Sequence, residues 1–127
     1  MMILVIGGAY QGKLEYVKER FHIQSEDIFD GELDSYESII NKKAILNFHL
    51  LMKRYLLNDI NGFDEVNKIL EMNPNIIIIT DEIGYGIVPL DPFERRYREE
   101  TGRVCCYLAK ESQEVIRVLC GIATKIK

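Results

Sequence analysis

A glycine-rich loop near the start of the chain limits the possible folds more than any other feature of the sequence. Met2–Ile6 is a short continuous apolar run, typical of a strand buried on both faces of a parallel sheet. Lys13–Phe21 then carries apolar residues at helical spacing. The loop between them fits G-x-x-x-x-G-K, a pattern that binds phosphate when it joins a strand to a helix. Its seven residues are Gly7, Gly8, Ala9, Tyr10, Gln11, Gly12 and Lys13.

This loop predicts a binding site for the phosphates of ATP or GTP. Glycines let successive backbone N–H groups turn toward a phosphate, the helix N-terminus adds partial positive charge, and Lys13 supplies a mobile cation. The alternative is a tight turn that needs glycine only for its shape. The residue after the lysine is Leu14, where a Ser or Thr hydroxyl normally holds Mg²⁺. Leucine cannot ligate a metal, so we expect weakened Mg²⁺ binding and assign no residue as a metal ligand.

The rest of the chain alternates strand-like and helix-like segments. Four consecutive isoleucines followed by a threonine, Ile76–Thr80, make the clearest central strand. The other predicted strands are Ile28–Asp30 and Val115–Leu119, and the predicted helices are Ser38–Leu57, Phe63–Met72 and Phe93–Glu111, with Gly121–Lys127 as a tail. This alternation predicts an α/β fold with a mostly parallel sheet. Together with the glycine loop, it indicates a three-layer sandwich of the P-loop NTPase type.

Length and composition set the expected number of domains and argue against several classes of partner and location. The chain has 127 residues, so we expect a single domain over residues 1–127. Its 16 basic and 20 acidic side chains give a formal charge of -4, which argues against nucleic acid as a partner, because counterion release requires clustered Lys and Arg. The three cysteines include no C-x-x-C pair and indicate reduced thiols. We recognise no signal peptide and no membrane span, which predicts a cytoplasmic protein.

A second group of polar residues follows the strand Ile76–Thr80. Carboxylates such as Glu82, just past the end of a strand, lie where open α/β sheets bind ligands. Downstream, Arg95, Arg98 and Arg103 belong to four arginines within nine positions. These arginines are candidates for an anion site. Interleaved acidic residues leave a solvated, salt-bridged helix face as an equal alternative.

Four segments together resemble the adenosylcobinamide kinase / adenosylcobinamide-phosphate guanylyltransferase family of cobalamin biosynthesis. They are the glycine loop, T-x-E-x-G-x-G-I-V-P at Thr80–Pro89, R-x-x-R-x-x-x-G-R at Arg95–Arg103 and G-I-x-x-K-I-K at Gly121–Lys127. The resemblance is dense over Thr80–Lys127, clear over Met1–Lys13 and thin between them. Members of this family phosphorylate the aminopropanol hydroxyl of adenosylcobinamide and then transfer a guanylyl group through a phosphoramidate on a histidine.

The resemblance implies roles for individual residues. Lys13, Asp30 and Glu82 become catalytic candidates, with Asp30 aligned to an acidic motif on the second strand of the family. Arg95, Arg98 and Arg103 become candidates for neutralising nucleotide phosphates, together with the seven residues of the glycine loop. The resemblance also implies a nucleotide cofactor, a corrinoid substrate and a homo-oligomer, by analogy a trimer.

The chain departs from the family in two respects that bear on activity. It is substantially shorter between the first helix and Ile76, where the family carries its strand–helix unit with the guanylylated histidine, and Leu14 replaces the metal-binding serine. His49 lies on an apolar stripe, which favours a core or groove-lining residue over a guanylyl acceptor. Three hypotheses follow: a kinase without guanylyltransferase activity, an inactive nucleotide-binding or assembly protein, and a small P-loop kinase for another alcohol.

Overall fold

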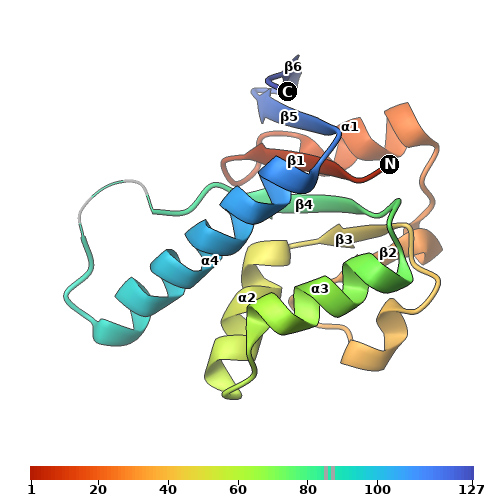
Figure 1. Ribbon diagram of the computed structural model, residues 1–127. Helices are drawn as coiled ribbons and strands as arrows, with labels where there is room; N and C mark the ends of the chain where they lie inside the picture. The colour runs from red at the N-terminus through yellow and green to blue at the C-terminus, as the bar shows by residue number, and fades with distance from the viewer. Residues whose placement is uncertain (85, 87) are drawn as a thin grey trace.

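The computed structural model describes residues 1–84, 86 and 88–127 and contains one six-stranded sheet (Figure 1). The strand order is β2-β3-β4-β1-β5-β6. Every neighbouring pair is parallel except β5 and β6, which are antiparallel. The strands are β1 (Ile3–Gly7), β2 (Ile28–Asp30), β3 (Ala44–Leu46), β4 (Ile77–Asp81), β5 (Glu114–Leu119) and β6 (Ile122–Lys125).

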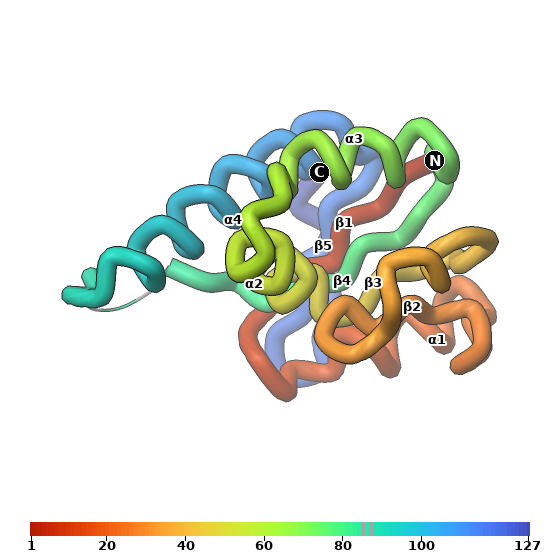
Figure 2. Tube along the Cα trace, turned by 90° about the horizontal axis from the view of Figure 1, so that it is seen from below, coloured from red at the N-terminus to blue at the C-terminus, as the bar shows by residue number. Residues whose placement is uncertain are grey.

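Helices cover both faces of the sheet, which makes the three layers expected from the sequence (Figure 2). The helices are α1 (Lys13–Phe21), α2 (Phe48–Leu57), α3 (Gly62–Met72) and α4 (Pro92–Glu111), with short 3-10 turns η1 (Ser25–Asp27) and η2 (Tyr36–Ile39). Helix α1 packs on one face, and α2, α3 and α4 pack on the other. The α/β class and the mostly parallel sheet are confirmed.

The central strands are continuously apolar because both of their faces are buried. Side chains alternate between the two faces of a strand, so Ile77 and Ile79 pack with Val17 of α1, whereas Ile76 and Ile78 pack with the three helices opposite. All four isoleucines are buried. This alternation also decides which polar residues at the end of β4 face which layer.

The prediction of one long helix over Ser38–Leu57 is wrong. Ala44–Leu46 is strand β3, inserted between β2 and β4, and the helix begins only at Phe48. Asn47 makes the sharp change of direction with a left-handed φ of 55°, which Asn tolerates better than most residues. Ala44 and Ile45 are fully buried between neighbouring strands, so pairing across the sheet outweighs the helical spacing of the apolar residues.

The predicted tail Gly121–Lys127 is also a strand over most of its length. Ile122–Lys125 forms β6, which pairs with β5 through a tight turn at Cys120 and Gly121. Both turn residues have positive φ, 51° and 77°, the combination of a two-residue hairpin that follows the sheet twist. The loop expected after β4 contains Tyr85 and Ile87 of the T-x-E-x-G-x-G-I-V-P segment, which lie outside the described residues.

Among the described residues, no helix has the length and apolar character that crossing a bilayer requires.

Candidate nucleotide-binding site

The glycine loop connects β1 to α1 at the carboxyl end of the parallel strands. Gly7 must be glycine, because a Cβ there would lie 2.5 Å from the carbonyl oxygen of Val118. Gly12 is the N-cap of α1 and has a φ of 91°, and Tyr10 is also left-handed, with a φ of 59°. Left-handed residues within such a loop turn backbone N–H groups toward a common concavity that suits an anion.

The loop is fastened to the turn between β5 and β6. The backbone N–H of Gly121 donates to the carbonyl oxygen of Gln11 at 2.8 Å. The N–H of Cys120 donates to the side-chain Oε1 of Gln11 at 2.6 Å. Gln11 therefore holds the middle of the loop through both its backbone and its side chain.

A cavity of about 440 Å³ lies beside this loop. Its walls come from the loop and the start of α1, from the end of β3 and start of α2, and from the end of β4. The lining residues outside the loop and α1 are Glu32, Leu46, Asn47, His49, Leu50, Ile79 and Asp81. This size lies within the range of small-molecule sites.

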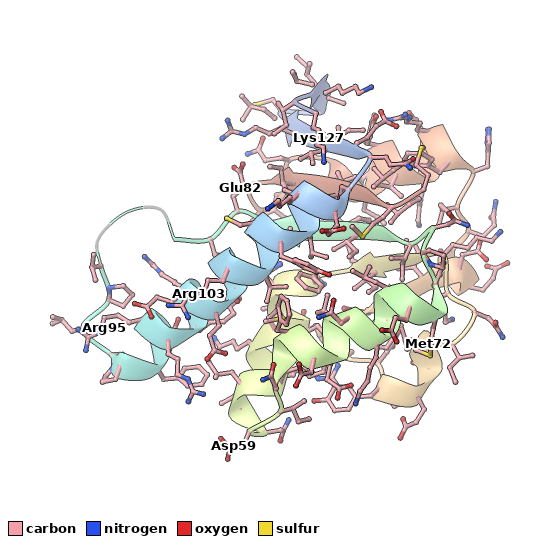
Figure 3. The ribbon with its side chains drawn as sticks, in the orientation of Figure 1. Asp59, Met72, Glu82, Arg95, Arg103 and Lys127 are labelled. Carbon is pink, nitrogen blue, oxygen red and sulfur yellow. The ribbon has the colours of Figure 1, made fainter. Side chains whose placement is uncertain are left out.

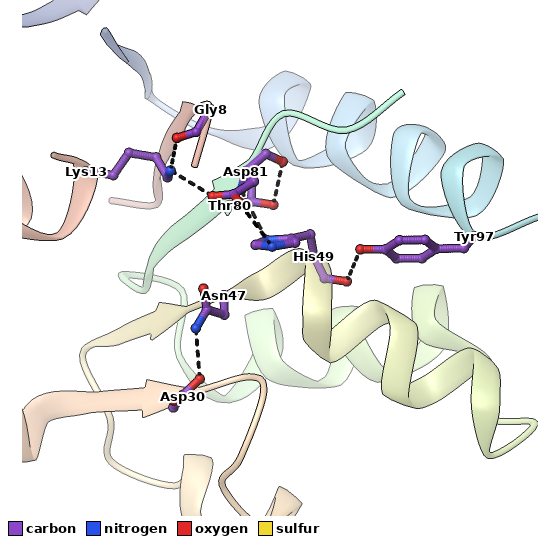
Figure 4. A network of polar contacts seen from close by, with 8 residues as sticks. All are labelled: Gly8, Lys13, Asp30, Asn47, His49, Thr80, Asp81 and Tyr97. Atoms are coloured by element: carbon purple, nitrogen blue, oxygen red, sulfur yellow. Dashed lines mark hydrogen bonds and ion pairs between the residues drawn. The ribbon is translucent and has the colours of Figure 1, made fainter. Parts of the chain in front are cut away.

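The ammonium group of Lys13 lies on the floor of this cavity between two oxygen partners (Figure 4). Its Nζ donates to the carbonyl oxygen of Gly8 at 2.6 Å and pairs with Oδ1 of Asp81 at 2.8 Å. Lys13 is only 7% exposed, so this charge pair is largely shielded from water. Strands β1 and β4 are neighbours in the sheet, and Gly7 lies opposite Asp81 in their register. The glycine loop that starts at Gly7 therefore carries Lys13 to the end of β4, where it meets Asp81.

His49 contacts the other carboxylate oxygen of Asp81 and its backbone. The backbone N–H of Asp81 donates to Nδ1 of His49 at 3.1 Å, and Nε2 lies 3.4 Å from Oδ2 of Asp81. Because Nδ1 accepts a hydrogen bond, the proton of the neutral imidazole resides on Nε2, where it faces the carboxylate. Burial lowers the pKa of His49, partly offset by the negative charge of Asp81. Both ring nitrogens are thus engaged by one residue.

The start of α2, which carries His49, is held against α4. The hydroxyl of Tyr97 donates to the carbonyl oxygen of His49 at 2.9 Å. Burial raises the pKa of Tyr97 to about 12, so the hydroxyl keeps its proton near neutral pH. Phe48, fully buried, anchors the same turn in the core.

The sequence-predicted acids do not take the central position. Oδ1 of Asp30 accepts from Nδ2 of Asn47 at 3.2 Å and from the backbone of Glu32 at 2.9 Å. Asn47 and Glu32 line the cavity, whereas Asp30 is not among its described lining residues and contacts these two residues through the hydrogen bonds just given. Glu82 points elsewhere, with its Oε2 3.1 Å from Arg117. The carboxylate that meets Lys13 is Asp81, which our sequence reasoning missed.

A signal for Asp81 exists in the sequence. If the strand Ile76–Thr80 is extended by one residue, the period of two puts residue 81 on the same face as Ile77 and Ile79. That face also receives the helix after the glycine loop. Glu82 then falls on the other face.

The predicted arginines lie away from the loop. Among the described residues that line the loop cavity, none is Arg95, Arg98 or Arg103. Figure 3 shows Arg95 near the start of α4, which projects from the sheet, and Arg103 further along the same helix. Arg103 lines a different cavity of about 480 Å³, between α4 and the α2–α3 connection.

The residues present fit a magnesium ion only in part. P-loop proteins commonly hold Mg²⁺ with a hydroxyl after the loop lysine and an acid at the end of a neighbouring strand. Asp81 provides the acid, and Leu14 provides no hydroxyl. Within the described part of the chain, no group of three or more His, Cys, Asp or Glu is arranged to hold a metal ion.

Comparison with known proteins finds relatives for the later two thirds of the chain. A family model described as cobinamide kinase / cobinamide phosphate guanyltransferase matches residues 44–126, more than half of the sequence. The bifunctional adenosylcobalamin biosynthesis protein CobU of Escherichia coli is 42% identical over 52 residues, which cover 41% of this chain and 29% of that protein. The protein of the same name from Salmonella typhimurium matches to the same extent.

These matches extend over less than a third of the length of the two curated relatives, and the glycine loop lies outside the residues that the family model covers. The family match nevertheless includes β3, β4, β5 and the helices α2, α3 and α4. The chain therefore belongs to the cobinamide kinase / cobinamide phosphate guanyltransferase family.

Proposed function

We propose that this protein binds ATP or GTP with the triphosphate against the glycine loop and transfers the γ-phosphoryl group to a hydroxyl of a cobinamide-type corrinoid. The observation that carries the proposal is the buried Lys13 ammonium, held at 2.6 Å from the Gly8 carbonyl and 2.8 Å from Asp81 on the floor of the loop cavity. A buried cation beside the N-terminus of a helix is the arrangement that favours phosphate. Family membership supports a kinase-type reaction.

The proposed roles follow from the contacts. Lys13 exchanges its contact with Asp81 for the nucleotide phosphates, and the loop amides hold the remaining oxygens. Asp81, still bound by His49, then orients the attacking hydroxyl. A bound Mg²⁺ would neutralise charge on the β- and γ-phosphates, and Asp81 is the residue that would hold it. By the family resemblance, we further propose that the protein assembles as a homo-oligomer and acts in the cytoplasm.

A second candidate is a protein that binds nucleotide without turnover. Leu14 favours it, because the loop lacks the hydroxyl that normally fixes the metal. This protein would use the same cavity and the same lysine. Only the transfer step separates the two candidates.

Phosphoryl transfer is tested with ATP and GTP labelled at the γ-phosphate. In the presence of magnesium and adenosylcobinamide, we expect slow appearance of label in the corrinoid, and no transfer in the absence of corrinoid. Mass spectrometry of the corrinoid identifies the phosphorylated product. Calorimetric binding of nucleotide with no transfer would establish the second candidate, and failure to bind either nucleotide would contradict both.

Guanylyl transfer through His49 is expected to be absent. Its Nδ1 accepts from the Asp81 backbone and its Nε2 faces the Asp81 carboxylate, so neither nitrogen has a free lone pair directed into the cavity. A histidine nucleophile needs an accessible, activated nitrogen. Incubation with GTP labelled at the α-phosphate should therefore leave no acid-labile label on the protein. A stoichiometric label that disappears in His49→Ala but persists in His22→Ala would refute this assignment.

A further inference from the structure

The cavity of about 480 Å³ between α4 and the connection from α2 to α3 is separate from the glycine loop. Among the described residues, none lines both this cavity and the one beside the loop. Its volume lies within the range of small-molecule sites. It is therefore a second candidate for ligand binding, and the proposed function makes no use of it.

The floor of this cavity is apolar and belongs to the hydrophobic core. Met52 and Leu56 of α2 and Val104 of α4 line it, and all three side chains are buried. Gly62, at the start of α3, leaves room for the end of Met52, because a Cβ at Gly62 would lie 2.6 Å from Cε of Met52. The flexible thioether of a methionine adapts to the shape of what packs on it. The floor therefore suits an aliphatic or aromatic group.

Polar side chains of α4 line the same cavity. Arg96, Glu100 and Arg103 are spaced by four and three residues, which places them on one face of the helix. Nε of Arg96 lies 3.1 Å from Oε1 of Glu100, so these two charges compensate each other. Arg103 is exposed, and its guanidinium has no ion pair or hydrogen bond within the described part of the chain. The cavity thus presents one uncompensated guanidinium beside an apolar floor.

The acidic residues of the cavity restrict the charge of a ligand. Glu100 lies between the two arginines in the sequence of this helix face, and a doubly charged phosphate would meet its repulsion. Asp59 also lines the cavity, but Figure 3 shows it at the outer tip of the α2–α3 connection, apart from Arg103. A singly charged group beside Arg103 fits this distribution better than a phosphate does. A carboxylate also matches the planar fork of the guanidinium.

We propose that this cavity binds a small carboxylic acid with an apolar body. Its carboxylate pairs with Arg103, and its body packs on Met52, Leu56 and Val104. Burial of the body supplies most of the binding free energy, since an ion pair open to water contributes little. The ion pair instead selects the acid over a neutral molecule of the same shape. Because the ligand contacts both α2 and α4, which the hydrogen bond from Tyr97 to His49 already joins, its binding should raise the melting temperature.

The test uses three probes: hydrocinnamate, which carries a phenyl group on a short carboxylate chain, its neutral amide hydrocinnamamide, and acetate. The methionine methyl groups of the full chain are labelled with carbon-13 and followed by NMR during titration. Hydrocinnamate should shift the signal of Met52 and leave those of Met2 and Met72 in place, because neither lines the cavity. The amide should bind about three- to tenfold more weakly, and acetate, which has no apolar body, should leave the Met52 signal unchanged.

Two variants decide whether Arg103 receives the carboxylate. Arg103→Gln should weaken hydrocinnamate binding about three- to tenfold and remove the preference over the amide. The matched control is Arg95→Gln, which removes the same charge from α4 outside the described lining of the cavity and should bind like the parent. An unshifted Met52 signal, equal affinity of the parent for acid and amide, or equal losses in the two variants would overturn the proposal. These outcomes are distinct from a failure to bind ATP, because the two cavities share no described lining residue.

Discussion

Replacing Lys13 with alanine is expected to weaken ATP and GTP binding by about 1.5–3 kcal/mol, or roughly ten- to a hundredfold. The variant removes the one ammonium group on the floor of the cavity among the described lining residues. It also leaves the Asp81 carboxylate facing the incoming phosphates without a compensating cation, which adds repulsion to the lost attraction. Isothermal titration of both nucleotides against the parent and the variant measures the effect.

The matched control is Lys18→Ala on the same helix. Lys18 contacts Ser25 and does not line the cavity, so its loss changes the net charge by the same amount without touching the site. We expect Lys18→Ala to bind like the parent, and circular dichroism should show both variants folded. Equal loss of affinity in the two variants would indicate that net charge, rather than the position of Lys13, governs binding.

Leu14→Ser should make nucleotide binding depend on magnesium. In the parent we expect similar ATP affinity in magnesium and in EDTA, because the residue after the loop lysine offers methyl groups where a hydroxyl normally meets the ion. The serine hydroxyl restores that contact beside Asp81, and affinity in magnesium should then exceed that in EDTA by roughly tenfold or more. Phosphoryl transfer should accelerate in the same variant, measured with γ-labelled nucleotide.

Leu14→Ala separates the two effects of the leucine. Alanine removes the methyl groups without adding a ligand, so its binding should remain nearly independent of magnesium. Leu14 also packs partly against the apolar cluster beneath α1. Leu14→Ser and Leu14→Ala both lose that packing, so the comparison between them isolates the hydroxyl. Strong magnesium dependence and rapid turnover in the parent would show that residue 14 does not face the metal.

The sequence predicted the parts of the site that depend on neighbouring residues. The strand, glycine loop and helix over residues 3–21 follow from local composition, and the structure has them where they were expected. Lys13 is the first helical residue, so its position is fixed by the loop that precedes it. The consecutive isoleucines of β4 likewise predict a strand that is buried on both faces.

The remaining partners of Lys13 depend on contacts that local patterns do not contain. Asp81 and His49 are 68 and 36 residues away, and they reach the loop only because β1, β4 and β3 are adjacent in the sheet. The prediction of one helix over Ser38–Leu57 omitted strand β3 and placed His49 in the middle of a helix. In the structure His49 is the second residue of α2, at the carboxyl edge of the sheet. The arginines of α4 were attributed to the nucleotide because spacing along a helix does not give the direction in which that helix leaves the sheet.

The contact between Gln11 and the β5–β6 turn has a consequence for the order of folding. The glycine loop precedes the β5–β6 turn by more than a hundred residues, yet two of its hydrogen bonds come from Cys120 and Gly121 in that turn. A growing chain can form β1 and α1 early, but it cannot fix the loop in this conformation until the hairpin of β5 and β6 has been added to the sheet. Under the proposed function, nucleotide binding reports on a sheet that includes β5 and β6, and by mass action the nucleotide stabilises that state over partly folded ones.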